Sequence, residues 1–182
     1  MVISRKLRRM AAAAVAVSAL SVIATGPASA ADNDGSFTLV NYGSGKCIEV
    51  VPDSNGNYFT NGNVIQQRTC DGSPAQRWYI STLRIEGLLA DHLVNRFTNQ
   101  CMDVKDGNQA DRAVVQQWTC NADGTSMAWI PGPSSLDPAA RSFTNWRSGK
   151  CIDIPGGSGQ DFAKLQQYRC TDPNTAQSFF RI

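Results

Sequence analysis

Apolar and polar residues alternate over short stretches through most of the chain after Ser36. Phe37–Asn41 is one such stretch, and Cys47–Val50 follows it after a glycine-rich turn. A period of two places successive side chains on opposite faces of a β-strand. The pattern therefore predicts many short strands separated by turns. Only the stretch Leu83–Ala90 is compatible with a helical turn.

The alternation occurs in three copies spaced by about fifty residues. Each copy begins with Cys-apolar-acid-apolar and ends with apolar-Gln-Gln-x-x-Cys, and an aromatic residue follows it. Repeats of this length indicate an array or a closed pseudo-symmetric fold, because one repeat cannot bury its own apolar face. The three copies are Cys47–Cys70, Cys101–Cys120 and Cys151–Cys170.

Four strands in each repeat predict an all-β barrel of twelve strands with three-fold pseudo-symmetry. We place the repeats at residues 36–82, 88–131 and 142–182. The proline-rich segment Pro131–Arg141 is expected to run over the surface as a connection. The equivalent apolar positions are expected to form layers of the core: Ile48, Met102 and Ile152; Val50, Val104 and Ile154; Trp78, Trp129 and Phe179.

The first thirty residues have a different pattern. A basic start precedes an apolar run from Met10 to Ala24, and Ala28-Ser29-Ala30 follows as a small-residue cleavage site. These features predict a secretory signal peptide at residues 1–30 and a single domain at residues 31–182. Gly26-Pro27 ends the run short of the ~20 residues that a membrane span needs. We therefore expect a secreted protein, and the Sec and twin-arginine routes both stay open.

The net charge of the chain argues against two classes of binding partner, nucleic acids and anionic membranes. Without the leader, thirteen basic residues stand against fifteen acidic ones, so the formal charge is −2. Nucleic-acid and anionic-membrane surfaces are recognised by clustered positive charge, which this composition lacks. The chain is expected to bind neither, and to be a monomer.

Six cysteines in an exported chain predict a disulfide framework. They allow fifteen pairings in principle, and the repetition favours one bond within each repeat. A zinc site is the competing interpretation, but the chain has no CxxC pair and one histidine, so no metal or cofactor is expected. The expected pairs are Cys47–Cys70, Cys101–Cys120 and Cys151–Cys170.

The three registered motifs resemble the ricin B-type lectin domain over Ser36–Ile182. They are Cys-[Ile/Met]-[Asp/Glu]-[Val/Ile], apolar-Gln-Gln-x-x-Cys and Gln-x-[Trp/Phe], with Met127 in place of the last glutamine in the second repeat. The resemblance implies a β-trefoil with three pseudo-symmetric four-stranded repeats. The same module occurs as a carbohydrate-binding module on secreted bacterial glycosidases.

The resemblance also implies one sugar site per repeat. The acid after the first cysteine would accept hydrogen bonds from sugar hydroxyls, and the residue two before the second cysteine would be an aromatic platform. A glutamine four before that cysteine and an Asn-Gln pair near the aromatic complete the family site. The second repeat keeps Asp103, Gln116 and Trp118, and the third keeps Asp153, Gln166, Tyr168 and Gln177.

General chemistry supports these roles, since charge-assisted hydrogen bonds are strong and an aromatic face buries the C–H face of a sugar. The first repeat has Glu49 for aspartate and Arg68 for the aromatic residue. We expect this site to be inactive, with an ion pair between the two. The blander alternative is that Asp103 and Asp153 are surface carboxylates and Trp118 a packing residue. Gln67, Gln117 and Gln167 alternate to the other face and are expected to be structural.

The sequence thus predicts a non-catalytic lectin for galactose-type sugars or a plant polysaccharide such as xylan. The one histidine, His92, falls in a connection between repeats, and no nucleophile elbow or phosphate loop occurs. A protein-binding trefoil, such as a secreted protease inhibitor that uses the loop Asp53–Asn63, is the alternative. An enzyme is the third possibility, tested by turnover of polysaccharides.

Overall fold

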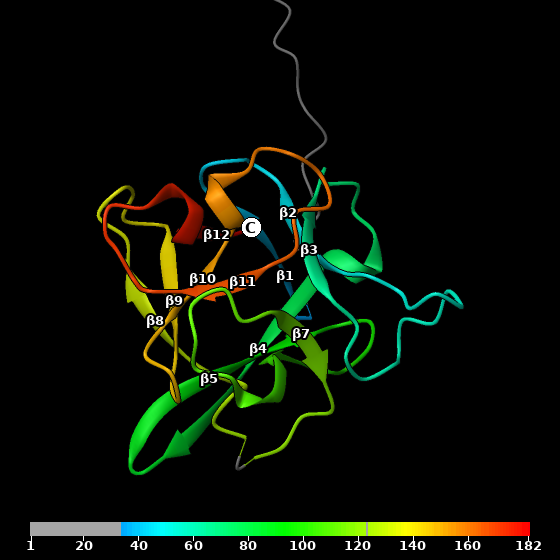
Figure 1. Ribbon diagram of the computed structural model, residues 1–182, viewed down its shortest axis with the longest axis horizontal. Coiled ribbons are helices and arrows are strands. Elements are labelled where there is room, and N and C mark those ends of the chain that lie inside the picture. Colours follow the sequence, from blue (N-terminus) through cyan, green and yellow to red (C-terminus); the bar gives the residue numbers. More distant parts are fainter. Residues whose placement is uncertain (1–33, 123) are drawn as a thin grey trace, which may run out of the picture. The chain divides into compact units, whose positions relative to one another are not determined.

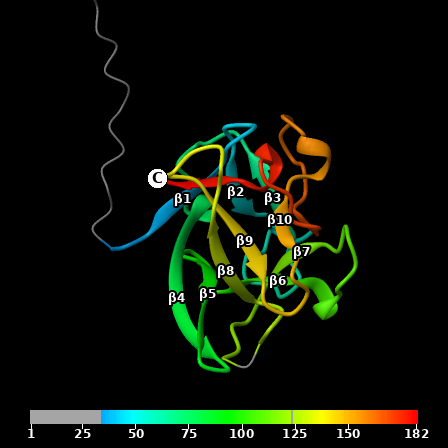
Figure 2. The same cartoon turned by 90° about the vertical axis from the view of Figure 1, so that its left-hand side faces the viewer.

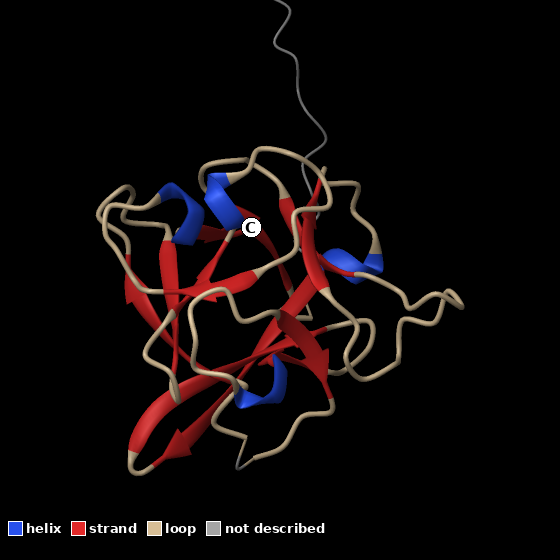
Figure 3. Cartoon of the chain, viewed as in Figure 1, coloured by secondary structure: helices blue, strands red, loops and turns tan. Residues whose placement is uncertain are grey.

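The structure of the protein, a computed structural model, describes residues 34–122 and 124–182. The predicted signal peptide at residues 1–30 lies outside the described residues. Strands and loops dominate, with short 3₁₀ helices between them (Figure 3). Within the described residues, no helix has the length and apolar character needed to cross a membrane.

The described residues contain four strands in each predicted repeat. The first repeat has β1 (Phe37–Asn41), β2 (Cys47–Val50), β3 (Ile65–Arg68) and β4 (Arg77–Ile85). The second has β5 (Leu88–Asn95), β6 (Cys101–Val104), β7 (Val115–Trp118) and β8 (Ala128–Pro133). The third has β9 (Arg141–Asn145), β10 (Cys151–Asp153), β11 (Gln166–Tyr168) and β12 (Phe179–Arg181). The 3₁₀ helices are η1 (Pro74–Gln76), η2 (Lys105–Gly107), η3 (Pro155–Gly157) and η4 (Thr175–Gln177).

Six of these strands close into a barrel. Antiparallel pairing runs from β1 to β4, β5, β8, β9 and β12, and β12 pairs with β1 again. The other six strands form the hairpins β2–β3, β6–β7 and β10–β11, each attached to the barrel through its first strand (Figures 1 and 2). A closed six-stranded ring with three hairpins is a β-trefoil, so the predicted fold class is confirmed.

The core has the predicted three-fold layers. Trp78, Trp129 and Phe179 are fully buried, and the other two predicted layers, which come from the hairpins, pack in the same cluster. The indole N–H of Trp78 donates to the Ile48 carbonyl at 2.8 Å, so burial leaves no polar atom of the ring unpaired.

The three predicted disulfides are confirmed. They join Cys47 to Cys70, Cys101 to Cys120 and Cys151 to Cys170, with Cα–Cα distances of 5.0, 5.1 and 5.0 Å. Each closes a loop of roughly twenty residues, which the chain-entropy model values at about 3 kcal/mol. Each bond joins the start of the hairpin's first strand to the chain just after its second strand. The disulfides therefore hold together the strands that carry the predicted sites.

Gln67, Gln117 and Gln167 are fully buried and link the repeats to one another. Each amide N–H₂ donates to two backbone carbonyls in a loop of the preceding repeat, counted cyclically, and each amide oxygen accepts from a hydroxyl of its own repeat. Their structural role is therefore confirmed, because every polar atom of the amide is used. The carbonyls belong to Ser158 and Gln160, Tyr58 and Thr60, and Asn108 and Ala110; the hydroxyls belong to Ser44, Thr98 and Ser148.

The stretch Leu83–Ala90, whose sequence is compatible with a helical turn, forms none. β4 and β5 form one long hairpin there, and Glu86 and Gly87 make the turn with φ of 49° and 85°. A two-residue turn with positive φ at both positions matches the twist of the flanking strands. The segment therefore forms two paired strands rather than a helical turn. His92 accordingly lies within β5 rather than in a connection, and β8 extends through Pro133 into the segment expected to be loop.

Candidate functional site

The β10–β11 hairpin carries a pocket that holds three of the four site residues predicted for the third repeat. Its volume is about 500 Å³. The strands supply its floor, and η3 and η4 supply its walls. We call it the third-repeat pocket; it is lined by Arg112, Asp153, Gly156, Gly157, Gln166, Tyr168, Arg169, Thr171, Asn174, Thr175 and Ala176.

A buried carboxylate lies at the floor of this pocket. Asp153 is 5% exposed and pairs across the hairpin with Gln166. Its Oδ1 accepts from Gln166 Nε2 at 2.7 Å, and its Oδ2 accepts from Gln177 Nε2 at 3.0 Å. Burial raises the pKa of the Asp153 carboxyl above its ordinary value, and the two amide hydrogen bonds oppose that shift. Each oxygen keeps a further lone pair for a ligand hydroxyl.

An aromatic ring stands beside the carboxylate. Tyr168 lies two positions after Gln166 on the same strand face, and both line the pocket with Asp153. The structure thus brings three of the four residues predicted for this repeat to one surface. The fourth, Gln177, is 1% exposed and does not line the pocket. Gln177 donates to the Asp153 carboxylate from the buried side and does not face the pocket.

The second-repeat pocket is the equivalent hollow on the β6–β7 hairpin, with a volume of about 170 Å³. Gln116 Nε2 donates to Asp103 Oδ2 at 3.0 Å, and Trp118 forms a rim that is 42% exposed. All three residues predicted for this repeat therefore share one pocket. Its lining is Asp103, Asp106, Gly107, Gln116, Trp118, Ser126 and Met127.

Asp103 differs from Asp153 in one bond. Met127 stands where the third repeat has Gln177, and Asp103 Oδ1 is a buried oxygen that has no hydrogen-bond partner among the described residues. Ser126 lies beside this carboxylate and favours its charged form, but its hydroxyl does not reach hydrogen-bonding geometry with Oδ1. Burial, the largest effect, raises the pKa of the Asp103 carboxyl, and the bond from Gln116 opposes it.

The first repeat keeps the buried acid but not the ring. Glu49 accepts from Gln66 at 2.8 Å and from Gln76 at 3.2 Å, which reproduces the support of Asp153. The expected ion pair between Arg68 and Glu49 is wrong. Arg68 lies opposite Cys47 at the end of the hairpin, and its guanidinium reaches Asp71 at 3.9 Å instead.

One residue of each site comes from the preceding repeat, and the sequence prediction missed it. Gly62, Arg112 and Phe162 each donate their backbone N–H to the carbonyl of the buried glutamine of the following repeat, at 2.9, 2.8 and 2.8 Å. Arg112 lines the third-repeat pocket, and a Cβ at Gly62 would lie 3.9 Å from Trp118. Each residue stands four positions before the first glutamine of its own Gln-Gln pair, which is the sequence signal that could have identified the set.

Comparison with known proteins decides the family. A family model described as "Ricin-type beta-trefoil lectin domain-like" matches residues 29–118 and 90–168. The chain belongs to this family. A search of curated proteins finds no match.

Solved structures show that this ricin-type lectin-like domain shares its fold with lectins and with parts of larger proteins. The designed three-fold symmetric protein ThreeFoil is 24% identical with a TM-score of 0.69, over 82% of this chain and 99% of that one. An exo-β-1,3-galactanase from Clostridium thermocellum is 26% identical with a TM-score of 0.70, over 83% of this chain and 30% of that one. The ricin B-like lectin of Macrolepiota procera, solved with lactose, is 13% identical with a TM-score of 0.63, over 80% of this chain and 93% of that one.

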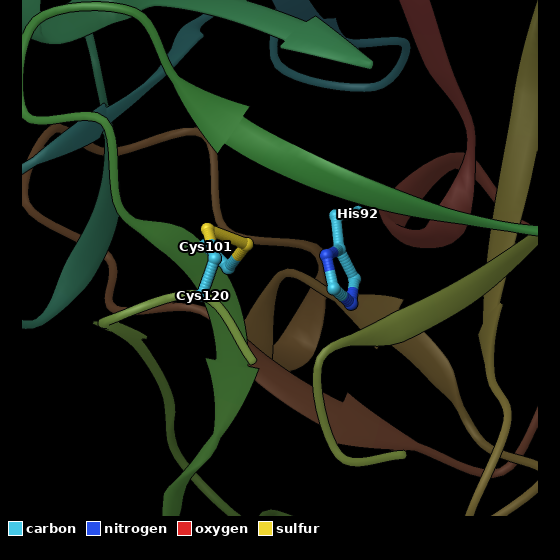
Figure 4. Close-up of side chains that lie close together, drawn as sticks. All are labelled: His92, Cys101 and Cys120. Carbon is cyan, nitrogen blue, oxygen red and sulfur yellow. A yellow bond between two sulfur atoms is a disulfide. The ribbon is translucent and has the colours of Figure 1, made fainter. Parts of the chain in front are cut away.

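The lectin-like domain also contains a group with the residue types of a metal site. The imidazole of His92 lies beside the sulfurs of Cys101 and Cys120, with ligand atoms within 4.8 Å of one another (Figure 4). The two sulfurs are bonded to each other, whereas metal ligation needs thiolates. Burial lowers the pKa of His92, and the neighbouring Asp91 opposes the shift. The group is therefore a packed histidine against a disulfide.

The unpaired oxygen of Asp103 leads to a stability prediction for the lectin-like domain. Because burial raises the folded-state pKa, the folded chain binds more protons than the unfolded chain between the two pKa values. Stability therefore falls as the pH rises through that window. Asp103→Asn removes the buried charge and is expected to raise the free energy of unfolding at pH 7, because a neutral amide costs less to bury than a carboxylate even when one of its atoms stays unpaired.

The control for this prediction is the pH dependence of the difference in stability between the wild type and Asp103→Asn. Thermal unfolding of the wild type and of Asp103→Asn at pH 7 and near pH 3 should show a gap at pH 7 that shrinks at low pH. Asp153→Asn should be destabilising instead, because its new N–H₂ would face the N–H₂ of Gln166 or Gln177. A destabilised Asp103→Asn at pH 7 would show that the carboxylate is not under a burial penalty.

Proposed function

We propose that the chain is a secreted, non-catalytic lectin that binds carbohydrate reversibly through the second-repeat and third-repeat pockets. The observation that carries the proposal is a buried carboxylate beside an aromatic ring, present in registered positions of two repeats. Asp103 and Asp153 would accept from sugar hydroxyls, and Trp118 and Tyr168 would stack on the sugar face.

Two known proteins support galactose-type sugars as the first ligands to test. One is an exo-β-1,3-galactanase and the other was solved with lactose. The present chain corresponds to 30% of the galactanase chain, whose activity belongs to that protein. Xylan stays the second ligand class. Three disulfides support an extracellular location.

Each pocket alone is expected to bind weakly, because both are open and shallow. A millimolar site contributes about −4 kcal/mol. Two such sites on one rigid domain raise the apparent affinity for a polymer or a glycan-covered surface through effective concentration. We therefore expect retention on immobilised polysaccharide to be much stronger than binding of the free monosaccharide.

The deciding experiment is binding of the purified chain to a glycan array, followed by calorimetric titration with galactose, lactose and xylo-oligosaccharides. The proposal expects saturable binding and no new reducing ends after prolonged incubation. An array with no bound glycan would refute the lectin function, and release of sugar would refute the non-catalytic role.

A protein-binding function is the second candidate, since the Asp53–Asn63 loop is internally braced. Asp53 Oδ1 accepts from the N–H groups of Asn55 and Asn57 at 2.8 and 3.0 Å, and its Oδ2 accepts from Thr60 Oγ1 at 2.7 Å. The loop presents Phe59 with 56% of its surface exposed. A braced loop with an exposed ring suits insertion into a partner's cleft. Inhibition of any member of a panel of secreted proteases, lost in Phe59→Ala, would favour this function.

A further inference from the structure

The two pockets differ in the charges of the residues that line them. Among the described residues, Asp103 and Asp106 line the second-repeat pocket and no arginine or lysine does, although Arg147 packs against Gly107 from outside that lining. The third-repeat pocket is lined by two arginines, Arg112 and Arg169, and by a single acid, Asp153. The pockets therefore should not prefer the same ligand.

The two arginines of the third-repeat pocket are not equivalent. Arg169 is engaged: its Nε lies 3.5 Å from Asp111, and its guanidinium carbon lies 5.5 Å from the centroid of the Tyr168 ring. Arg112 is exposed, and among the described residues it has no carboxylate within ion-pair distance. The nearby acid, Asp111, is already paired with Lys150 at 2.7 Å. Arg112 is thus an uncompensated cation at the rim.

The backbone fixes where this cation stands. Arg112 has φ of 69°, in the left-handed region, and donates its N–H to the carbonyl of Gln167 at 2.8 Å. Gln167 in turn binds the carbonyls of Asn108 and Ala110 in the same loop. Gln167 also donates its backbone N–H to the carbonyl of Ala113 at 2.9 Å, so the loop is held to the hairpin on both sides of Arg112 and the side chain starts from a defined point on the pocket wall.

We infer that the third-repeat pocket takes an acidic saccharide, one that carries a uronate carboxylate. The inference rests on the proposed lectin function and names its ligand class. Neutral hydroxyls of the sugar would face Asp153, while the carboxylate lies at the rim against Arg112, since two carboxylates at the floor would repel. A planar guanidinium matches the two oxygens of a carboxylate, and a sulfated sugar in the experiment below distinguishes uronates from other oxyanions.

The experiment compares matched sugars at each pocket by NMR titration of the full domain. The pairs are galactose with galacturonic acid, and xylotriose with xylotriose bearing a glucuronic acid. Resonances of the Tyr168 ring report on the third-repeat pocket, and the Trp118 indole reports on the second. At low salt the uronate member should bind the third-repeat pocket about three- to fivefold more tightly, the scale of one exposed ion pair. That preference should shrink at high salt.

Arg112→Gly is the test variant, because Gly62 occupies the same position of the first repeat. Glycine accepts the positive φ and keeps the backbone N–H, so the fold is retained. Arg112→Gly should abolish the difference in affinity between the uronate and the neutral member of each pair, and Arg112→Lys should keep part of that difference. Phe162→Gly, the matched change at the third equivalent position, should leave the preference intact.

The outcomes separate the inference from the function it rests on. Equal or weaker binding of the uronates at Tyr168, with neutral sugars still bound, overturns the acidic-ligand inference and leaves the lectin function standing. A preference that survives Arg112→Gly overturns it too. Preference for a sulfated galactose but not for the uronates assigns the pocket to sulfate esters instead. If no saccharide shifts the Tyr168 resonances, both proposals fail at this pocket.

Discussion

The double variant Asp103→Ala with Asp153→Ala is expected to lose all measurable carbohydrate binding. Each carboxylate is the strongest acceptor of its pocket, and a hydrogen bond to a charged group contributes about 1.5–3 kcal/mol. Each single variant should therefore lose about tenfold or more in affinity at its own pocket. Loss of both sites also removes the gain from two-site attachment, so retention on immobilised polysaccharide should disappear. Titration and column retention measure the two effects.

Glu49→Ala is the matched control, because Glu49 has the same amide support but Arg68 stands at the position that Trp118 and Tyr168 occupy in the other repeats. Sugar binding should be unchanged. Stability should fall by about 1–3 kcal/mol, since the amides of Gln66 and Gln76 lose their buried acceptor. This variant therefore separates loss of a buried bond from loss of a sugar contact. Binding by a folded double variant, or loss of binding in Glu49→Ala, would contradict the assignment of the two pockets.

Repetition explains why so much of this domain was predictable. Met102 or Asp103 alone could belong to any exposed strand, but three registered copies fix which strands pair and which cysteines bond. The period of two then divides each hairpin into a core face and a pocket face. That division placed Asp103 with Trp118 and Asp153 with Tyr168, and the structure shows both pairs lining a shared pocket.

What escaped prediction depends on contacts between segments that are far apart in sequence or on turn geometry. Arg112 reaches the third-repeat pocket from the second repeat, through a backbone bond to a residue 55 positions away. The hairpin at Leu83–Ala90 depends on the left-handed turn at Glu86-Gly87, and no repeat motif covers it. Arg68 stands in the same register to Glu49 as Trp118 does to Asp103, so a long side chain could reach the carboxylate. The Glu49 carboxylate instead accepts from Gln66 and Gln76, and Arg68 lies near Asp71. These partners could not be read from side-chain reach alone.

The adjacent residues Gln166 and Gln167 have different roles, because their side chains lie on opposite faces of one strand. Gln166 faces the pocket and donates to Asp153 at 2.7 Å. Gln167 faces inward, is fully buried, and joins the third repeat to the loop of the second. The same amide group therefore serves ligand binding at one position and cohesion of the repeats at the next.

Alanine at each position should separate these two roles. Gln167→Ala leaves two buried carbonyls and the Ser148 hydroxyl without a partner, so the free energy of unfolding should fall by about 2–4 kcal/mol. Gln166→Ala should lower it by only about 1 kcal/mol, because water reaches Asp153 through the open pocket, yet sugar affinity there should fall about tenfold. Denaturant unfolding and sugar titration of both variants provide the measurement. Equal losses of stability in Gln166→Ala and Gln167→Ala would mean that the pocket face of the strand supports the fold as strongly as the core face. The position of the carboxylates on the pocket face would then not assign them to ligand binding.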